Sequence, residues 1–205
     1  MIQVIEVKTK KQLRDFIKFP DKLYKGNQYR VPPLHTFEKA ALSPDKNPAF
    51  EFCEAKYWLA YENNKIVGRI AGIINNRGNE IWKENTVRFG WIDFTDNVDV
   101  ATALFKEVEN WGKSKGMTKI QGPLGFCDMD MEGTLVEGFD ELSTQTVLYN
   151  YPYYPVYYSS YTTGMANIQM MDLKISDSFP SKQSYQVKRQ PIRWKEPLIQ
   201  LPLCS

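Results

Sequence analysis

The stretch from Thr86 to Gly122 constrains the fold more than any other part of the sequence. Thr86–Phe94 is rich in aromatic and β-branched residues, which predicts a strand. Val100–Trp111 carries apolar residues at three- and four-residue steps, which predicts an amphipathic helix that ends at Gly116. Thr118–Gly122 predicts the next strand. Strand, helix and strand at this spacing form a right-handed crossover between parallel neighbours.

The residues before this crossover predict three further strands and a helix. Ile2–Val7 alternates apolar and polar side chains, as a half-buried strand does. Glu54–Tyr61 and Ile66–Ile74 alternate on either side of a two-asparagine turn, which predicts a hairpin. We expect a helix that is capped by Thr9 and stops before Pro20, because proline cannot donate the helical hydrogen bond.

The residues after the crossover have a different character. Gly122–Asp140 is glycine-rich and acidic, and we expect it to be irregular. Tyr149–Tyr161 is crowded with tyrosines, which would suit an amine or acyl pocket or a loop packed over the sheet by its own rings. Met170–Ile175 predicts another strand, and 176–205 shows no periodicity and is interpreted as a tail or truncated appendage.

These elements predict one α/β (α+β) domain over residues 1–175. We expect a mixed, mostly antiparallel twisted sheet with helices on both faces and a splayed parallel strand pair. The 26 basic and 24 acidic residues are too balanced to favour nucleic acid or an anionic membrane. Three scattered cysteines and the single His35 offer no disulfide framework and no metal site. Without a signal pattern or a long apolar run, the sequence predicts a soluble, cytoplasmic protein.

Five stretches also resemble a known family. They are Asn47–Phe52, Val87–Phe94, Gly122–Phe126, Leu135–Phe139 and Tyr149–Pro155. Together with the order of the elements, they resemble a divergent bacterial branch of the GNAT superfamily, the acyl-CoA-dependent N-acyltransferases, whose substrates are unassigned. The resemblance implies transfer of an acyl group from acetyl-CoA, another acyl-CoA or a carrier thioester to the amine of a small molecule or a peptide.

The resemblance also implies where the donor binds. The Val87–Phe94 strand would hold the pantetheine arm through its main chain, and the next helix would hold the diphosphate at its N-terminus. Asp96 and Asp99 stand where the family has spaced glycines, and their simplest role is to cap the following helix. Each would also repel a diphosphate by about 1 kcal/mol or more. The alternative is therefore a non-catalytic binding module that has lost the diphosphate site, or a domain completed by a C-terminal partner. The implied cofactor-binding residues are Phe89, Gly90, Trp91, Ile92, Asp93, Phe94, Asn97 and Val98.

The resemblance suggests the catalytic residues less directly. The family's general-acid tyrosine corresponds here to Ser160, and the neighbouring Tyr157 and Tyr161 are candidates to protonate the leaving thiolate. Glu137 is the candidate base, with Asp93 as a second choice. Acidic residues near Asp130 would suit a cationic substrate or a metal, or form a solvated loop. The candidate acceptor-binding residues are Asp128, Asn150 and Tyr154.

Overall fold

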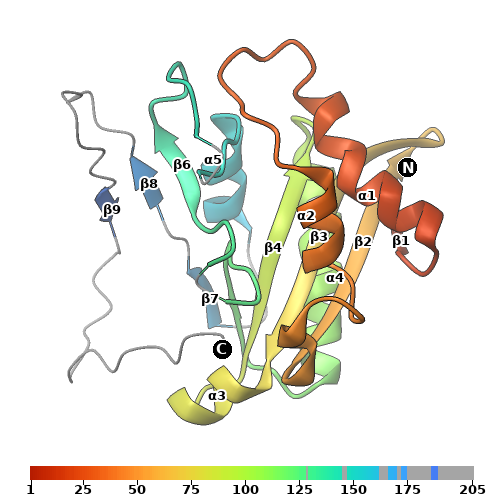
Figure 1. Ribbon diagram of the computed structural model, residues 1–205, viewed down its shortest axis with the longest axis vertical. Coiled ribbons are helices and arrows are strands. Elements are labelled where there is room, and N and C mark those ends of the chain that lie inside the picture. Colours follow the sequence, from red (N-terminus) through yellow and green to blue (C-terminus); the bar gives the residue numbers. More distant parts are fainter. Residues whose placement is uncertain (128, 145–146, 162–165, 170–171, 175–185, 189–205) are drawn as a thin grey trace.

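The computed structural model describes residues 1–127, 129–144, 147–161, 166–169, 172–174 and 186–188 (Figure 1). Its main sheet has the strand order β1-β2-β3-β4-β5-β7, and β6, β8 and β9 form a second sheet. The strands are β1 (Gln3–Glu6), β2 (Cys53–Glu62), β3 (Lys65–Asn75), β4 (Thr86–Phe94), β5 (Lys119–Gln121), β6 (Thr134–Glu137), β7 (Ala166–Gln169), β8 (Asp172–Lys174) and β9 (Gln186–Lys188). The helices are α1 (Lys10–Leu23), α2 (His35–Ala41), α3 (Asn76–Trp82), α4 (Val98–Ser114) and α5 (Tyr153–Ser160), with a 3-10 helix at Pro48–Glu51.

The main sheet confirms the predicted fold class. Strands β1 to β4 pair antiparallel, whereas β4 and β5 pair in parallel across the α4 crossover. The predicted hairpin is β2 and β3, and its turn residues Asn63 and Asn64 have φ of 48° and 60°, as a two-residue hairpin turn requires. The arrangement is the mixed, mostly antiparallel sheet with one parallel strand pair that the sequence indicated.

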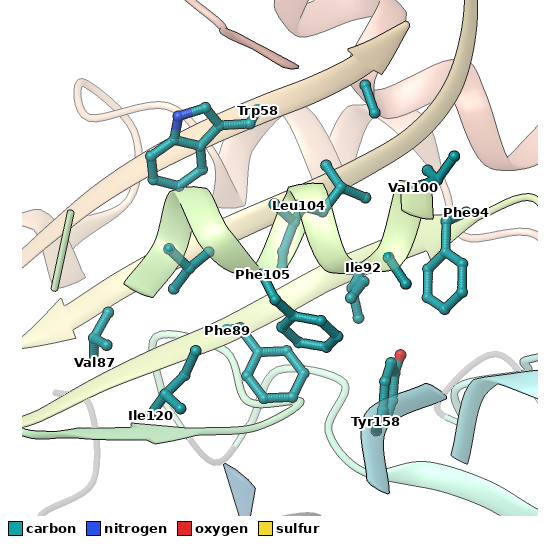
Figure 2. Close-up of a cluster of buried hydrophobic side chains, with 14 of the residues drawn as sticks. Trp58, Val87, Phe89, Ile92, Phe94, Val100, Leu104, Phe105, Ile120 and Tyr158 are labelled. Atoms are coloured by element: carbon teal, nitrogen blue, oxygen red, sulfur yellow. The ribbon is translucent and has the colours of Figure 1, made fainter. Parts of the chain in front are cut away.

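Helices cover both faces of this sheet. Helix α4 packs on one face, and α1 and α2 lie over the other (Figure 1). Figure 2 shows Phe105 of α4 pointing at Phe89 of β4, with Tyr158 of α5 beside the two rings. The close approach of α4 requires a glycine at position 68, because a Cβ there would lie 2.8 Å from Cδ1 of Leu104.

Helix α1 differs from its prediction because it continues through Pro20 to Leu23. Pro20 has no N–H to donate to the carbonyl of Phe16, four residues earlier. That carbonyl instead accepts a hydrogen bond of 3.1 Å from Nη1 of Arg69 on β3. The helix therefore tolerates the proline because a side chain from the sheet replaces the missing donor.

The predictions after Gly122 were wrong in part. The segment expected to be irregular contains β6, and the tyrosine-rich stretch forms α5 in place of a loop. Strand β6 pairs in parallel with β8, and the side-chain amide of Asn150 braces it by accepting from the N–H of Leu135 at 2.7 Å and donating to the carbonyl of Leu135 at 3.1 Å. Of the predicted Met170–Ile175 strand, β8 is described, and the remainder lies outside the described residues. The division at residue 175 stays a prediction.

Candidate functional site

Strands β4 and β5 part after a short parallel contact. They pair at three positions, the last of which joins Arg88 to Gln121, and β4 then continues to Phe94 paired with β3 but not with β5 (Figure 1). The chain after β5 stays bonded to β4 at one further main-chain position, from the N–H of Leu124 to the carbonyl of Phe89 at 2.7 Å, and Nη1 of Arg88 donates to the carbonyls of Gly125 and Phe126. A Cβ on Gly90 would lie 2.4 Å from the carbonyl oxygen of Leu124, so this crossing requires glycine.

Strand β4 has a β-bulge where the two strands part. Arg69 of β3 pairs with Asp93 and Ala71 pairs with Gly90. Strand β4 therefore has one more residue than β3 between these two pairs. Trp91 lies in this bulge and has φ of 43°, a conformation that is costly for a bulky side chain. Bulges are frequent beside active sites because they redirect side chains. The bulge therefore marks this end of β4 as the candidate site.

A buried ion pair anchors the strand just beyond the bulge. Arg69 and Asp93 are 5% and 8% exposed, and Nε and Nη2 of Arg69 lie 2.8 and 2.7 Å from Oδ2 of Asp93. The hydroxyls of Tyr24 and Tyr154 lie 3.0 and 3.3 Å from Oδ1 of the same carboxylate. Burial raises the pKa of both tyrosines, and the Asp93 charge raises it further. Both oxygens of Asp93 are thus already bonded, which suits an anchor better than a base.

Tyrosines of α5 bond the main chain at the end of β4. The N–H of Phe94 donates to the hydroxyl of Tyr154 at 3.1 Å, and the hydroxyl of Tyr153 donates to the carbonyl of Phe94 at 2.7 Å. The Tyr154 ring stacks on that of Phe94 with centroids 4.4 Å apart. These main-chain groups are among those predicted to bind the acyl donor. In this structure the chain's own tyrosines occupy them.

A carboxylate that the sequence analysis missed lies on the other side of the bulge. Glu38 of α2 is 7% exposed, and its Oε2 accepts a hydrogen bond of 2.8 Å from Nε1 of Trp91. Burial raises the pKa of Glu38, and the charges of Asp93 and Asp130 add to the rise, whereas Arg69 and the Trp91 hydrogen bond oppose it. The sequence held one signal that Glu38 is buried, because it lies one helical turn before the apolar Leu42, which is itself buried.

The two candidate catalytic tyrosines lie one turn apart at the end of α5, and each is bonded to a different carboxylate. The hydroxyl of Tyr157 donates to Oδ1 of Asp96 at 2.6 Å, and that of Tyr161 donates to Oε2 of Glu109 at 2.7 Å. The bond to Asp96 raises the pKa of Tyr157, while burial and then the bond to Glu109 raise the pKa of Tyr161. A higher pKa makes either phenol a weaker acid. Glu137 is exposed at the end of β6, in the second sheet.

The acceptor predictions also stay untested by this geometry. Asn150 is fully buried as the brace of β6, and Tyr154 is fully buried against Asp93. Asp128 lies outside the described residues. Among the residues that are described, no three His, Cys, Asp or Glu side chains form a group that could hold a metal. The carboxylate of Asp130 accepts from the N–H of Phe126 at 2.7 Å, which ties its loop together.

The turn before α4 is built differently from the sequence interpretation. Asn97, in place of Asp96 or Asp99, caps the helix by accepting from the N–H of Asp99 at 2.9 Å. Asp99 lies in the first turn, where the helix dipole favours its charge. Val98 is 48% exposed at the start of the helix. The two predicted diphosphate-binding residues, Asn97 and Val98, therefore lie beside two carboxylates.

Comparisons with known proteins find relatives that are longer than this chain. No family model matches the sequence. Protein YghO of Escherichia coli K12 is 36% identical over 145 residues, which are 71% of this chain and 37% of that protein. The bacterial ceramide synthase of Caulobacter vibrioides is 32% identical over 140 residues, which are 68% of this chain and 36% of that protein. The chain thus spans little more than a third of the curated relatives it matches.

Solved structures resemble the chain over 58% of its length. A tandem GNAT protein from the clavulanic acid biosynthesis pathway is 12% identical at a TM-score of 0.45, with 35% of it covered. A GNAT-family acetyltransferase of Staphylococcus aureus is 20% identical at 0.41, with 72% covered. FeeM, an N-acyl amino acid synthase from uncultured soil microbes, is 12% identical at 0.40, with 69% covered. Within the described ranges, no helix is both long enough and apolar enough to cross a membrane.

Proposed function

We propose that this chain takes part in transferring an acyl group from a thioester to an amine. The donor would be an acyl-CoA or a carrier-bound acyl group. One relative is named a ceramide synthase, and a ceramide is a long-chain amino alcohol acylated on nitrogen. Because the chain covers 36% of that relative, the activity of the whole protein is part of the proposal.

The observation that carries the proposal is the parting of β4 from β5 beyond Arg88. A thioester arm needs hydrogen-bond partners along its length, and a strand without its neighbour supplies main-chain groups at regular spacing. The proposed donor-binding residues are those of β4 from Phe89 to Phe94, with Asn97 and Val98 beyond them. The amine would attack the thioester carbonyl directly, while the bulge at Trp91 positions the strand.

The proposal requires a rearrangement at the end of β4. The hydroxyls of Tyr153 and Tyr154 must leave the main chain of Phe94 before a donor can use it. Tyr157, whose hydroxyl bonds Asp96, stays a candidate acid for the leaving thiolate. Tyr161, Glu137 and the acceptor residues stay predictions, as does the cytoplasmic location. The acceptor class we propose is a small-molecule or peptide amine.

A calorimetric titration with acetyl-CoA and octanoyl-CoA tests the donor half of this proposal. We expect saturable binding of at least one of them, and thiol release when an amine is added. Octanoyl-CoA separates acyl-chain recognition from recognition of CoA itself. The absence of heat at millimolar concentrations of both donors would contradict the acyl-CoA version.

A second candidate function is a non-catalytic binding module. Two carboxylates, Asp96 and Asp99, lie beside the proposed diphosphate position. Two tyrosine hydroxyls of α5 bond the main-chain N–H and carbonyl of Phe94. Removing both charges by Asp96→Asn and Asp99→Asn should strengthen CoA binding, since each exposed repulsion costs about 1 kcal/mol. Stronger binding without thiol release in any amine mixture would favour the module. Unchanged affinity would show that the two carboxylates do not oppose the diphosphate.

A further inference from the structure

We propose that Glu38 is the general base that takes the proton from the attacking amine. This inference rests on the acyl transfer proposed above, because it assigns a role within that reaction. The supporting contact is the hydrogen bond of 2.8 Å from Nε1 of Trp91 to Oε2 of Glu38. Trp91 is the bulged residue of β4. The carboxylate is thus fixed against the strand at the point where β5 has left it.

The second oxygen of Glu38 is available for a proton. Among the described residues, Trp91 is the one hydrogen-bond donor to this side chain. Asp93, the other carboxylate beside the bulge, has Arg69 on one oxygen and two tyrosine hydroxyls on the other. A base must have a lone pair that can reach the proton before its pKa becomes relevant. Of these two buried carboxylates, Glu38 meets that condition better.

The surroundings of Glu38 suit a protonated amine. The charged groups that act on it are Arg69 from β3, Asp93 from β4 and Asp130 from the loop after β5. Arg69 is paired with Asp93, which offsets its positive charge, and the Asp130 carboxylate adds negative charge that favours a cation near Glu38. Burial and these acids raise the pKa of Glu38 toward the pH at which a general base is most effective.

The amine nitrogen attacks the thioester carbonyl carbon, a C–N bond forms and the C–S bond breaks. The electron pair of the C–S bond leaves with the thiolate. The proton of the nitrogen moves to Oε1 of Glu38 and is passed to the thiolate or to water. The products are an amide and a thiol, and no oxidant or reductant is needed.

The test compares Glu38→Gln with the unchanged chain. Glutamine has the same size and its side-chain oxygen can still accept from Trp91, but it cannot take up a proton. The assay would measure thiol release from octanoyl-CoA with a long-chain amino alcohol between pH 4 and pH 9. We expect kcat to fall about 100-fold or more, with the KM for octanoyl-CoA changed less than about twofold. The acid limb of the pH profile, where kcat rises as Glu38 loses its proton, should disappear.

A matched control is Glu80→Gln on α3, which removes an exposed carboxylate outside the proposed site and should leave kcat unchanged. Glu38→Asp should recover part of the rate and retain an acid limb. Turnover of Glu38→Gln equal to that of the unchanged chain would overturn the inference and leave the acyl transfer standing. Loss of octanoyl-CoA binding together with turnover would also overturn it, because the residue would then be structural. An unchanged chain that neither binds octanoyl-CoA nor releases thiol would instead refute the proposed function.

Discussion

Single residues at the end of β4 hold the strand in its bent conformation. Trp91 adopts φ of 43°, and the Glu38 carboxylate bonds its indole. Two residues further on, Asp93 is paired with Arg69 and with two tyrosine hydroxyls. A strained backbone position persists only when its surroundings fix it, so these contacts are expected to have measurable effects on stability.

The Glu38→Gln variant is expected to be more stable than the unchanged protein at pH 8. The folded state raises the pKa of Glu38, so it binds this proton more tightly than the unfolded state does. The stabilisation from this group is complete below the unfolded pKa and is lost as pH rises through the folded pKa. Thermal unfolding from pH 4 to pH 8 should therefore show a gain in Tm that grows with pH. A lower Tm for the variant at pH 8 would contradict this reading.

Arg69→Met should destabilise the protein by about 3–5 kcal/mol, because it leaves the buried Asp93 carboxylate without its cation. The measurement is the free energy of unfolding from urea titration at pH 7. The control is the double variant Arg69→Met with Asp93→Asn, which removes both charges. It should lose less stability than the single variant, and an equal or larger loss would argue against this ion pair as the cause.

At the scale of helices and strands, the sequence pattern predicted those elements that depend on residues close together in the chain. The α4 crossover, the hairpin and the limits of β4 follow from apolar spacing and turn residues. The continuation of α1 through Pro20 could not be predicted, because the replacement donor is Arg69, far away in the sequence. Strand β6 likewise depends on the amide of Asn150. Glu38 was missed because a polar residue in a short helix usually faces solvent.

The packing of α4 on the sheet can be tested at Gly68. A Cβ there would lie 2.8 Å from Leu104 Cδ1 and 2.9 Å from Val100 Cγ1, so Gly68→Ala should cost about 1–3 kcal/mol through overpacking. Adding Leu104→Val shortens one of the two neighbours and should restore part of the loss relative to the sum of the single variants. Strictly additive losses in urea unfolding would show that the two positions do not clash.

At the scale of the whole molecule, α5 closes the end of β4 that the parting of β4 and β5 would otherwise expose. Its tyrosines bond both main-chain groups of Phe94 and pack with α4 on one side of the sheet. Helix α2 and Glu38 lie on the opposite side, with α1. The sequence predicted that the two strands part. It could not predict that α5 covers the end of β4, because this depends on contacts between segments about 60 residues apart.

Removing one of these covering hydroxyls should increase donor binding. Tyr153→Phe frees the carbonyl of Phe94, and a hydrogen bond of this kind contributes about 0.5–1.5 kcal/mol. We expect the affinity for octanoyl-CoA to rise by up to about tenfold in calorimetry. Tyr149→Phe is the control, since its hydroxyl bonds the carbonyl of Phe139 and not β4. Equal changes in the two variants would argue against a role for Phe94.

The most direct test of the account is to look for the amide product itself. The purified chain would be mixed with octanoyl-CoA and a long-chain amino alcohol, and amide and thiol would be quantified by mass spectrometry and a thiol reagent. We expect one amide formed for each thiol released, at a rate that Glu38→Gln lowers about 100-fold or more. Amide and thiol levels no higher than those without protein would contradict it.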